Sequence, residues 1–338
     1  MPEAEDAAPA RLDRAPADVD VAIIGAGPTG LFAAYYAGFR GLSTAVIDAL
    51  PEPGGQVTAM YPEKIIYDVG GFPSIRGRDL VENLVTQAGQ FNPTYLLGVR
   101  ADKLGYASDG RPVLTLSDGE SLTCGAVLIT GGLGSFTARP LPAADAFSGT
   151  GVVFFVKQLD LLSGHDVVIV GGGDSAFDWA LALQPVAKSV TLVHRRDKFR
   201  AHAGTVSRVQ ELPVEIIVNA EVTRIVGDGQ VTGCEVTVRG ATPRILPSDT
   251  VVAALGFTAD LGPLADWGLT LDRRHIVVDS TTATNLPRVF AAGDISEYPG
   301  KVRLIATGFG EAATAVNNAA VAIDPSAHLF PGHSSEGS

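Results

Sequence analysis

The sequence predicts an α/β protein built from two Rossmann-like, three-layer domains, one inserted within the other. Its 338 residues favour about two domains. A glycine-rich turn follows a short apolar run at Gly25 and again at Gly171. A second apolar run ends 23 positions after each of these glycines, at Asp48 and at His194. A strand, turn, helix and strand repeated in one register indicate two nucleotide-binding units.

The first unit opens with the nearly all-apolar run Asp20 to Ile24, which is typical of a parallel strand buried on both faces. Apolar spacing predicts a helix over 30–40, and Thr44 to Ile47 reads as the next strand. After this unit we expect, in order, a long ordered loop over 54–73, a helix over 78–90, and strands over 113–116 and 126–130.

A segment dense in glycine and proline, 131–142, is the candidate hinge between the domains. The second unit then has an expected strand over 166–170, a helix over 175–184 and a strand over 190–193. Beyond it we expect a strand-rich insertion over 214–218, 223–226 and 234–238, a strand over 250–255, a last strand at 289–291 and a helix over 308–323. The last strand and helix are expected to return to the first domain.

These elements place the first domain at 19–135 and 256–324 and the inserted domain at 136–255. Residues 1–18 are rich in Ala, Pro, Asp and Arg and are expected to form a disordered leader. Residues 325–338 form a short polar C-terminal extension.

Composition narrows the function classes. The formal net charge of −12 argues against nucleic acid as the main partner. The two cysteines, Cys124 and Cys234, form no Cys-x-x-Cys motif, and the histidines show no ligand spacing, so no metal site is expected. The sequence has neither a secretory signal nor an apolar run of roughly 18 residues, so we expect a cytoplasmic protein without membrane contact.

In the first turn, Gly25-x-Gly27-x-x-Gly30, each glycine has a mechanical task. The first makes the tight turn, the second lets the backbone approach a pyrophosphate, and the third allows close contact between helix and strand. The start of the helix presents free N–H groups to the phosphates. Asp48, at the end of the next strand, can accept hydrogen bonds from both ribose hydroxyls.

The second turn has Gly171, Gly173 and, in the third position, Ala176. The position of the acid is taken by His194, and the cations that follow it are Arg195, Arg196 and Arg200. Guanidinium groups can grip a ribose 2′-phosphate, which a carboxylate would repel. This favours NADP(H) over NAD(H), and the alternative is a solvated basic surface segment.

Asp294 and Tyr61 could each either bind a cofactor or have an ordinary structural role. Gly293-Asp294 alone would be a simple turn, but beside the first motif Asp294 can hydrogen-bond the ribityl chain of a flavin. The following helix could then aim its N-terminus at the flavin N1–C2 edge. Tyr61 could stack on an isoalloxazine face or be an ordinary buried loop tyrosine, and the sequence favours neither.

With these residues in hand, the chain resembles the thioredoxin-reductase-like ferredoxin–NADP+ reductases of bacteria, which are FAD-containing flavoproteins with two dinucleotide-binding domains. The resemblance runs from about Val19 to His333. The stretches that carry it are 54–56, 61–68, 171–175, 194–202, 291–294 and 308–318.

The resemblance implies an FAD-binding first domain and an NADP-binding inserted domain. It implies FAD contacts at Gly25, Gly27, Gly30, Asp48, Gln56, Tyr61, the backbone near Ala101, Phe136 and Asp294. It implies NADP contacts at Gly173, Asp174, Ser175, His194, Arg195, Arg196 and Arg200. In this family the counterpart of Tyr61 stacks on the flavin, and the C-terminal extension covers the other flavin face of the partner subunit. His333 fits that role, Ser335 corresponds less clearly to the hydroxyl residue that follows it, and the extension implies a homodimer.

The implied activity is exchange of a hydride between NADP(H) and FAD N5, and of single electrons between FAD and ferredoxin or flavodoxin. Thioredoxin reductase has a Cys-x-x-Cys just before its second glycine motif, whereas residues 149–164 here contain no cysteine, so the electron acceptor must be external. No side chain is expected to act as an acid, base or nucleophile. The alternatives are an NADPH-dependent reductase of another acceptor, such as a quinone, and a flavin redox sensor without turnover. An acidic ferredoxin would need a local basic patch, for which Lys64, Arg76 and Arg78 are candidates.

Overall fold

The computed structural model describes residues 16–330 and 332, and contacts between residues divide the chain into two units. The first unit comprises 1–58, 65–135 and 260–338, and the second comprises 59–64 and 136–259. Most of the expected leader, together with His333 and Ser335, lies outside the described residues. Each unit is described by itself.

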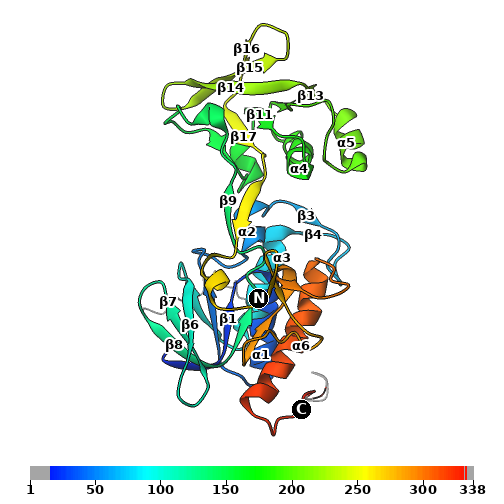
Figure 1. Ribbon diagram of the computed structural model, residues 1–338. Coiled ribbons are helices and arrows are strands. Elements are labelled where there is room, and N and C mark those ends of the chain that lie inside the picture. Colours follow the sequence, from blue (N-terminus) through cyan, green and yellow to red (C-terminus); the bar gives the residue numbers. More distant parts are fainter. Residues whose placement is uncertain (1–15, 331, 333–338) are drawn as a thin grey trace, which may run out of the picture. The chain divides into compact units, whose positions relative to one another are not determined.

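The first unit is built on a seven-stranded sheet (Figure 1). The strand order is β5-β2-β1-β8-β7-β6, and β21 pairs with β8 on a separate branch. The strands are β1 (Asp18–Ile24), β2 (Thr44–Asp48), β5 (Thr94–Leu97), β6 (Ala101–Tyr106), β7 (Pro112–Leu116), β8 (Ser121–Ile129) and β21 (Val289–Ala291). Strands β5, β2, β1, β8 and β21 are parallel, so their carboxyl ends meet at one edge. The predicted return of the last strand to this domain is confirmed.

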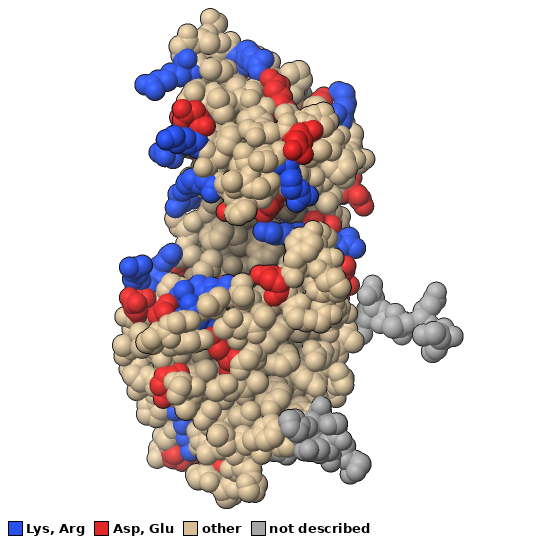
Figure 2. Space-filling model, turned by 90° about the vertical axis from the view of Figure 1, so that its right-hand side faces the viewer, with Lys and Arg blue, Asp and Glu red and all other residues tan. Residues whose placement is uncertain are grey.

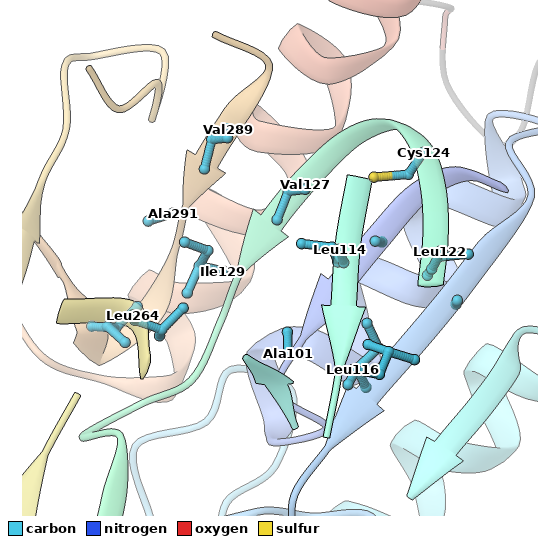
Figure 3. Packing of buried hydrophobic residues seen from close by; sticks show 14 of the residues in the cluster. Ala101, Leu114, Leu116, Leu122, Cys124, Val127, Ile129, Leu264, Val289 and Ala291 are labelled. Carbon is cyan, nitrogen blue, oxygen red and sulfur yellow. The ribbon is translucent and has the colours of Figure 1, made fainter. Parts of the chain in front are cut away.

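The long helices of this unit pack together: α1 (Pro28–Phe39) contacts both α3 (Gly77–Gly89) and α6 (Ile305–Ile323). A separate buried cluster includes side chains of β7 and β8 with Leu264 and Val289 (Figure 3). The smaller elements are α2 (Gln56–Met60), β3 (Ile65–Ile66), β4 (Ile75–Arg76), η3 (Gly262–Asp266), β19 (Leu271–Asp272), β20 (His275–Val277), η4 (Gly293–Ile295) and β22 (Ser296–Glu297).

The second unit has three layers around a parallel five-stranded sheet of order β10-β17-β11-β12-β13. Its strands are β10 (Val152–Val153), β11 (Asp166–Val170), β12 (Ser189–Val193), β13 (Val214–Ile217) and β17 (Thr250–Ala253). One buried cluster joins the sheet to α4 (Asp174–Leu183) and α5 (Ala203–Gln210). Another joins it to an antiparallel sheet of β14 (Ala220–Gly227), β15 (Val231–Val238) and β16 (Arg244–Pro247). The remaining elements are β9 (Ser135–Ala138), which pairs with β18 (Phe257–Asp260), η1 (Pro142–Ala144) and η2 (Leu159–Leu162).

Three sequence expectations need correction. The segment 214–218 is not part of the strand-rich insertion, because β13 pairs in parallel with β12 in the main sheet. A four-residue apolar strand does not reveal its pairing partner, and this explains the error. The expected loop over 54–73 contains the short helix α2 and strand β3, and the candidate hinge contains β9. Helix α5 was not expected. Within the described residues no helix is long and apolar enough to span a membrane, and no cluster of side chains could hold a metal.

Candidate functional site

The first glycine turn joins β1 to α1 in the first unit. Gly25 has a φ of +113°, and an added Cβ there would lie 2.6 Å from the carbonyl oxygen of Thr130. A Cβ on Gly30 would lie only 1.8 Å from the carbonyl oxygen of Gly25. By contrast, a Cβ on Gly27, the N-cap of α1, would meet nothing within 4 Å. The turn is therefore tightly packed inside and open at the helix N-terminus, where a diphosphate could approach.

Asp48 ends β2 and is fastened to this turn. Its Oδ2 accepts the N–H of Ala26 at 2.7 Å, and its Oδ1 accepts the N–H of Leu50 at 2.8 Å. Burial raises the pKa of Asp48, and the two backbone hydrogen bonds oppose that rise. The backbone that follows β5 lies beside it, since the N–H of Val99 donates to the carbonyl of Asp48 at 3.0 Å. Ala101, the predicted backbone contact, begins the next strand and is buried.

The segment containing Gln56 lies against the same turn. The N–H of Gly54 donates to the carbonyl of Ala26 at 2.8 Å. A Cβ on Gly55 would lie 3.0 Å from the Cα of Gly27, so the two backbones are in close contact. The side-chain nitrogen of Gln56 lies 2.7 Å from where a Cβ of Gly132 would be. Gln56 thus reaches the loop that leaves the carboxyl end of β8.

The Gly293-Asp294 turn, which follows β21, also meets the start of α1. Gly293 has a φ of +79°, and a Cβ there would lie 2.8 Å from the hydroxyl oxygen of Thr29. A Cβ on Gly308, in the first turn of α6, would lie 2.4 Å from the same oxygen. Burial raises the pKa of Asp294, and Lys301 is the largest opposing influence. The first unit therefore brings together the predicted residues Gly25, Gly27, Gly30, Asp48, Gln56, Ala101 and Asp294.

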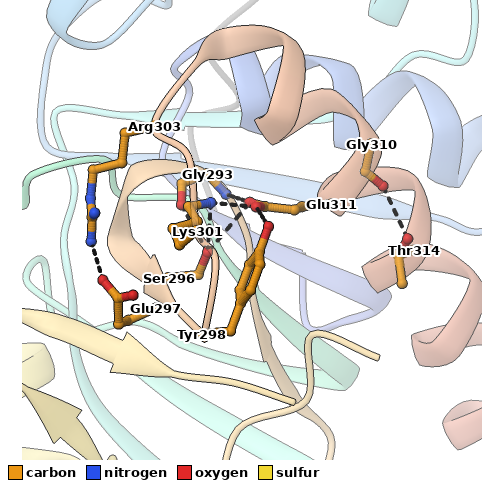
Figure 4. Close-up of polar contacts among 9 residues, drawn as sticks. All are labelled: Gly293, Ser296, Glu297, Tyr298, Lys301, Arg303, Gly310, Glu311 and Thr314. Carbon is orange, nitrogen blue, oxygen red and sulfur yellow. Dashed lines mark hydrogen bonds and ion pairs between the residues drawn. The ribbon is translucent and has the colours of Figure 1, made fainter. Parts of the chain in front are cut away.

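Beneath Gly293 lies a buried polar cluster that the sequence reasoning missed (Figure 4). One oxygen of Glu311 accepts the N–H of Gly293 at 2.7 Å. The other accepts the hydroxyl of Tyr298 at 2.6 Å and pairs with the ammonium of Lys301. The Lys301 and Glu311 side chains are only 1% and 8% exposed. A lone Glu in a predicted helix reads as a solvated residue, so only the tertiary fold reveals this cluster.

The second glycine turn joins β11 to α4 in the second unit. A Cβ on Gly171 would lie 2.4 Å from the carbonyl oxygen of Ala254, while one on Gly173, the N-cap of α4, would meet nothing within 4 Å. Ala176 is fully buried in the third position. Asp174 begins the helix, and its Oδ1 accepts the N–H of His202 at 2.8 Å. Ser175 is exposed.

His194 follows β12 and packs over this turn. Its ring lies 2.3–2.5 Å from where a Cβ of Gly172 would be, so only a glycine admits it. The ring Nε2 lies 3.2 Å from the carbonyl oxygen of Lys198, and the N–H of Arg200 donates to the carbonyl of Gly172 at 2.7 Å. Burial, and secondarily the neighbouring arginines, lower the pKa of His194. Burial therefore favours the neutral form of the ring, and the hydrogen bond to the Lys198 carbonyl opposes this shift.

The three arginines of this segment, Arg195, Arg196 and Arg200, are exposed. Their guanidinium groups form no ion pair with any residue that the structure describes. They are therefore available to bind an anion near the N-terminus of α4.

Two predicted flavin contacts fall outside the first unit. Tyr61 lies in the segment 59–64 of the second unit. Phe136 also belongs to the second unit and packs on the rings of Phe155 and Phe257, with centroids 6.5 and 6.1 Å away.

The candidate basic patch receives little support. Lys64 pairs with Asp178 at 2.8 Å, and Arg76 pairs with Asp79 at 3.3 Å. On the face shown in Figure 2, basic and acidic side chains are interspersed.

Comparison with known proteins places the chain in a family. Residues 19–319 match the family of pyridine nucleotide-disulphide oxidoreductases. The chain belongs to this family. Curated proteins named ferredoxin–NADP reductase are similar over nearly the whole chain. The protein from Salinispora arenicola (strain CNS-205) is 77% identical over 95% of this chain and 99% of its own length. The protein from Saccharopolyspora erythraea is 64% identical over 95% of this chain and 98% of its own length.

A solved structure of T. acidophilum thioredoxin reductase is 30% identical, covers 89% of this chain and 97% of its own, and has a TM-score of 0.73. The predicted fold class and the resemblance drawn from the sequence are both confirmed. Cys124 and Cys234 are both buried, and burial raises the pKa of the first thiol to about 12 and of the second to about 11. Neither thiol is suited to exchange with a disulfide.

Proposed function

We propose that the chain is an FAD-dependent ferredoxin–NADP+ oxidoreductase. It is an oxidoreductase of a family that uses FAD and NADP(H), as the sequence predicted. One observation supports the assignment of the two cofactors to the two turns. Both are open at a helix N-terminus, yet one ends in the carboxylate of Asp48 and the other in Arg195 and Arg196.

The first unit fits FAD. The open cradle at Gly27 suits the diphosphate, because the N-terminal N–H groups of α1 and the helix dipole favour an anion there. Asp48 uses one hydrogen bond per oxygen on the backbone, which leaves lone pairs for ribose hydroxyls. Asp294 and the N-terminus of α6 would hold the ribityl chain and the ring. When bound, FAD would take a hydride from NADPH at N5 and release electrons singly.

The second unit fits NADP(H). Gly173, Asp174 and Ser175 would receive the diphosphate at the start of α4. Arg195, Arg196 and Arg200 would bind the 2′-phosphate. The pairing of Asp174 with the His202 N–H and the packing of His194 on Gly172 hold that segment in place. His194 therefore supports the site through this packing.

Other roles remain part of the proposal. Tyr61 and Phe136 would contact the flavin, and His333 with Ser335 would cover the flavin of the partner in a homodimer. Domain limits at 136–255 for the NADP domain, and the extension over 325–338, are proposed on the same grounds. The protein would act in the cytoplasm without nucleic acid.

The acceptor would be an external one-electron carrier, ferredoxin or flavodoxin. The absence of a Cys-x-x-Cys and the burial of both thiols support an external acceptor. The name of the relatives, ferredoxin–NADP reductase, supports the choice of ferredoxin.

The test is anaerobic reduction of the purified, FAD-loaded protein with NADPH, followed by addition of ferredoxin with cytochrome c as the final acceptor. We expect the flavin absorbance to bleach, and ferredoxin to restore it and support cytochrome reduction. No bleaching would refute every enzymatic assignment and leave a redox sensor. If a quinone reverses the bleaching but ferredoxin and flavodoxin do not, the assignment of ferredoxin or flavodoxin as the electron carrier is refuted.

A further inference from the structure

We propose that Glu311 and Lys301 are positioning residues for the flavin: a buried, charge-balanced pair that fixes the Gly293-Asp294 turn and sets the electrostatic field at its base. The inference deepens the proposed function and rests on it.

The geometry makes Glu311 the centre of the cluster. Its carboxylate joins three stretches of chain: the Gly293 turn, the segment after β22 that carries Tyr298 and Lys301, and α6 (Figure 4). The hydroxyl of Ser296 adds a longer contact of 3.4 Å to the same carboxylate and donates to the carbonyl of Gly293 at 2.9 Å. The ammonium of Lys301 also lies 3.2 Å from the Ser296 oxygen and 5.3 Å from the centre of the Tyr298 ring.

Such a cluster is not explained by stability alone. Taking two charges out of water costs several kcal/mol per ion, and apolar residues of similar volume often replace a buried pair without loss. In some proteins a buried ionic group instead fixes one particular arrangement of the chain around it. Here the arrangement includes Gly293 with a φ of +79°, a backbone conformation that packs directly on Thr29 at the start of α1.

The two charges also act on the neighbouring Asp294 with opposite sign. Lys301 lowers the pKa of Asp294 and Glu311 raises it, so both fields reach the residue proposed to contact the flavin. Within the pair each charge offsets part of the effect of the other, and Arg303 lowers the pKa of Asp294 as well. Removing one leaves the other uncompensated in a medium that screens poorly.

A cycle of variants separates positioning from general loosening. We compare Glu311→Gln, Lys301→Met and the double variant. Asp109→Asn is the matched control, because Asp109 forms an exposed pair with Arg111 in the same unit and neither residue is among the groups that shift the pKa of Asp294. The readouts are the Kd of FAD for the apoprotein and the midpoint potential of the bound flavin.

Each single variant should weaken FAD binding by about tenfold, the loss expected for a hydrogen bond to a charged group. Reduction adds negative charge to the flavin, so the potential should rise in Glu311→Gln, where the cation remains, and fall in Lys301→Met. In the double variant it should return toward the wild-type value. Asp109→Asn should change neither quantity.

Shifts of potential in the same direction, or none, would overturn the proposal, as would an unchanged Kd in both single variants. If a single variant does not fold, the double variant decides: it should fold, with weakened FAD binding and a potential near wild type. If the wild-type apoprotein binds no FAD, the proposed function itself is refuted. Normal wild-type binding with unaffected variants refutes only this inference.

Discussion

The two glycine turns share one backbone plan but treat the end of the second strand in opposite ways. In the first, Asp48 points inward: the Ala26 N–H of the turn donates to one carboxylate oxygen, and the Leu50 N–H, just after β2, donates to the other. In the second, the inward place is taken by the ring of His194, which packs over Gly172. The charges of Arg195 and Arg196 stay in solvent.

The difference shows how one turn can serve two purposes. A carboxylate that is already ordered and partly desolvated suits hydroxyl groups, which need fixed acceptors and carry no charge. Exposed guanidinium groups suit a phosphate, which is recognised by charge and paired donors. The internal packing differs as well, because Gly30 has no room for a side chain while Ala176 occupies the same position in the second turn.

The largest expected effect comes from exchanging the residues at the third position of the two glycine motifs, Gly30 and Ala176. Gly30→Ala would place a methyl 1.8 Å from the carbonyl oxygen of Gly25, so α1 must move. We expect the protein to lose bound FAD on purification and to lose about 3 kcal/mol or more of unfolding free energy. Ala176→Gly is the control, with an expected loss of about 1 kcal/mol and no loss of FAD. FAD content and urea unfolding measure both, and normal FAD content in Gly30→Ala would contradict the packing argument.

The next effect concerns charge in the second turn. Replacing Arg195 and Arg196 together with Ala should raise the Kd of NADPH by roughly 100-fold, since each charged hydrogen bond contributes about 1.5–3 kcal/mol. The Kd of NADH should barely change, because NADH has no 2′-phosphate. Binding is measured by fluorescence titration. Lys188→Ala removes an exposed cation paired with Asp166 in the same unit and should leave both Kd values unchanged. Equal losses for NADPH and NADH would refute the 2′-phosphate role.

Much of this pair of turns could be predicted from the local sequence. The remaining features could not be predicted, and the reason is physical. The spacing from Gly25 to Asp48 and from Gly171 to His194 is a property of one βαβ unit, so the chain order reveals it. Helix α5 has eight residues and a single buried side chain, Val209, which leaves little apolar periodicity to detect.

Glu311 is a residue whose role could not be predicted from the sequence, because its contacts are long-range. It meets Gly293 across 18 positions and Lys301 across 10, and these contacts exist only after α6 packs against the turn. In the sequence it is a single Glu in a helical pattern. The lowered pKa of His194 was equally hidden, because it is caused mainly by burial, which the sequence does not show.

The smallest expected effect tests this lowered pKa. Because the folded protein lowers the pKa of His194 below its ordinary value of 6.5, the folded state binds fewer protons there than the unfolded state. Stability from this group is therefore complete above pH 6.5 and is lost as the pH falls through the folded pKa. In His194→Gln, which keeps a donor for the Lys198 carbonyl and cannot titrate, this loss should be absent.

The measurement is urea unfolding of both proteins at several pH values from 7.5 down to about 5, with the difference between them taken at each pH. The difference removes contributions from other titrating groups, including His275, whose pKa is also lowered by burial. We expect the wild type to lose unfolding free energy relative to the variant only below pH 6.5. A relative gain on acidification would mean that His194 is charged in the fold. The second turn would then present four cations, and its contrast with Asp48 would be one of charge alone.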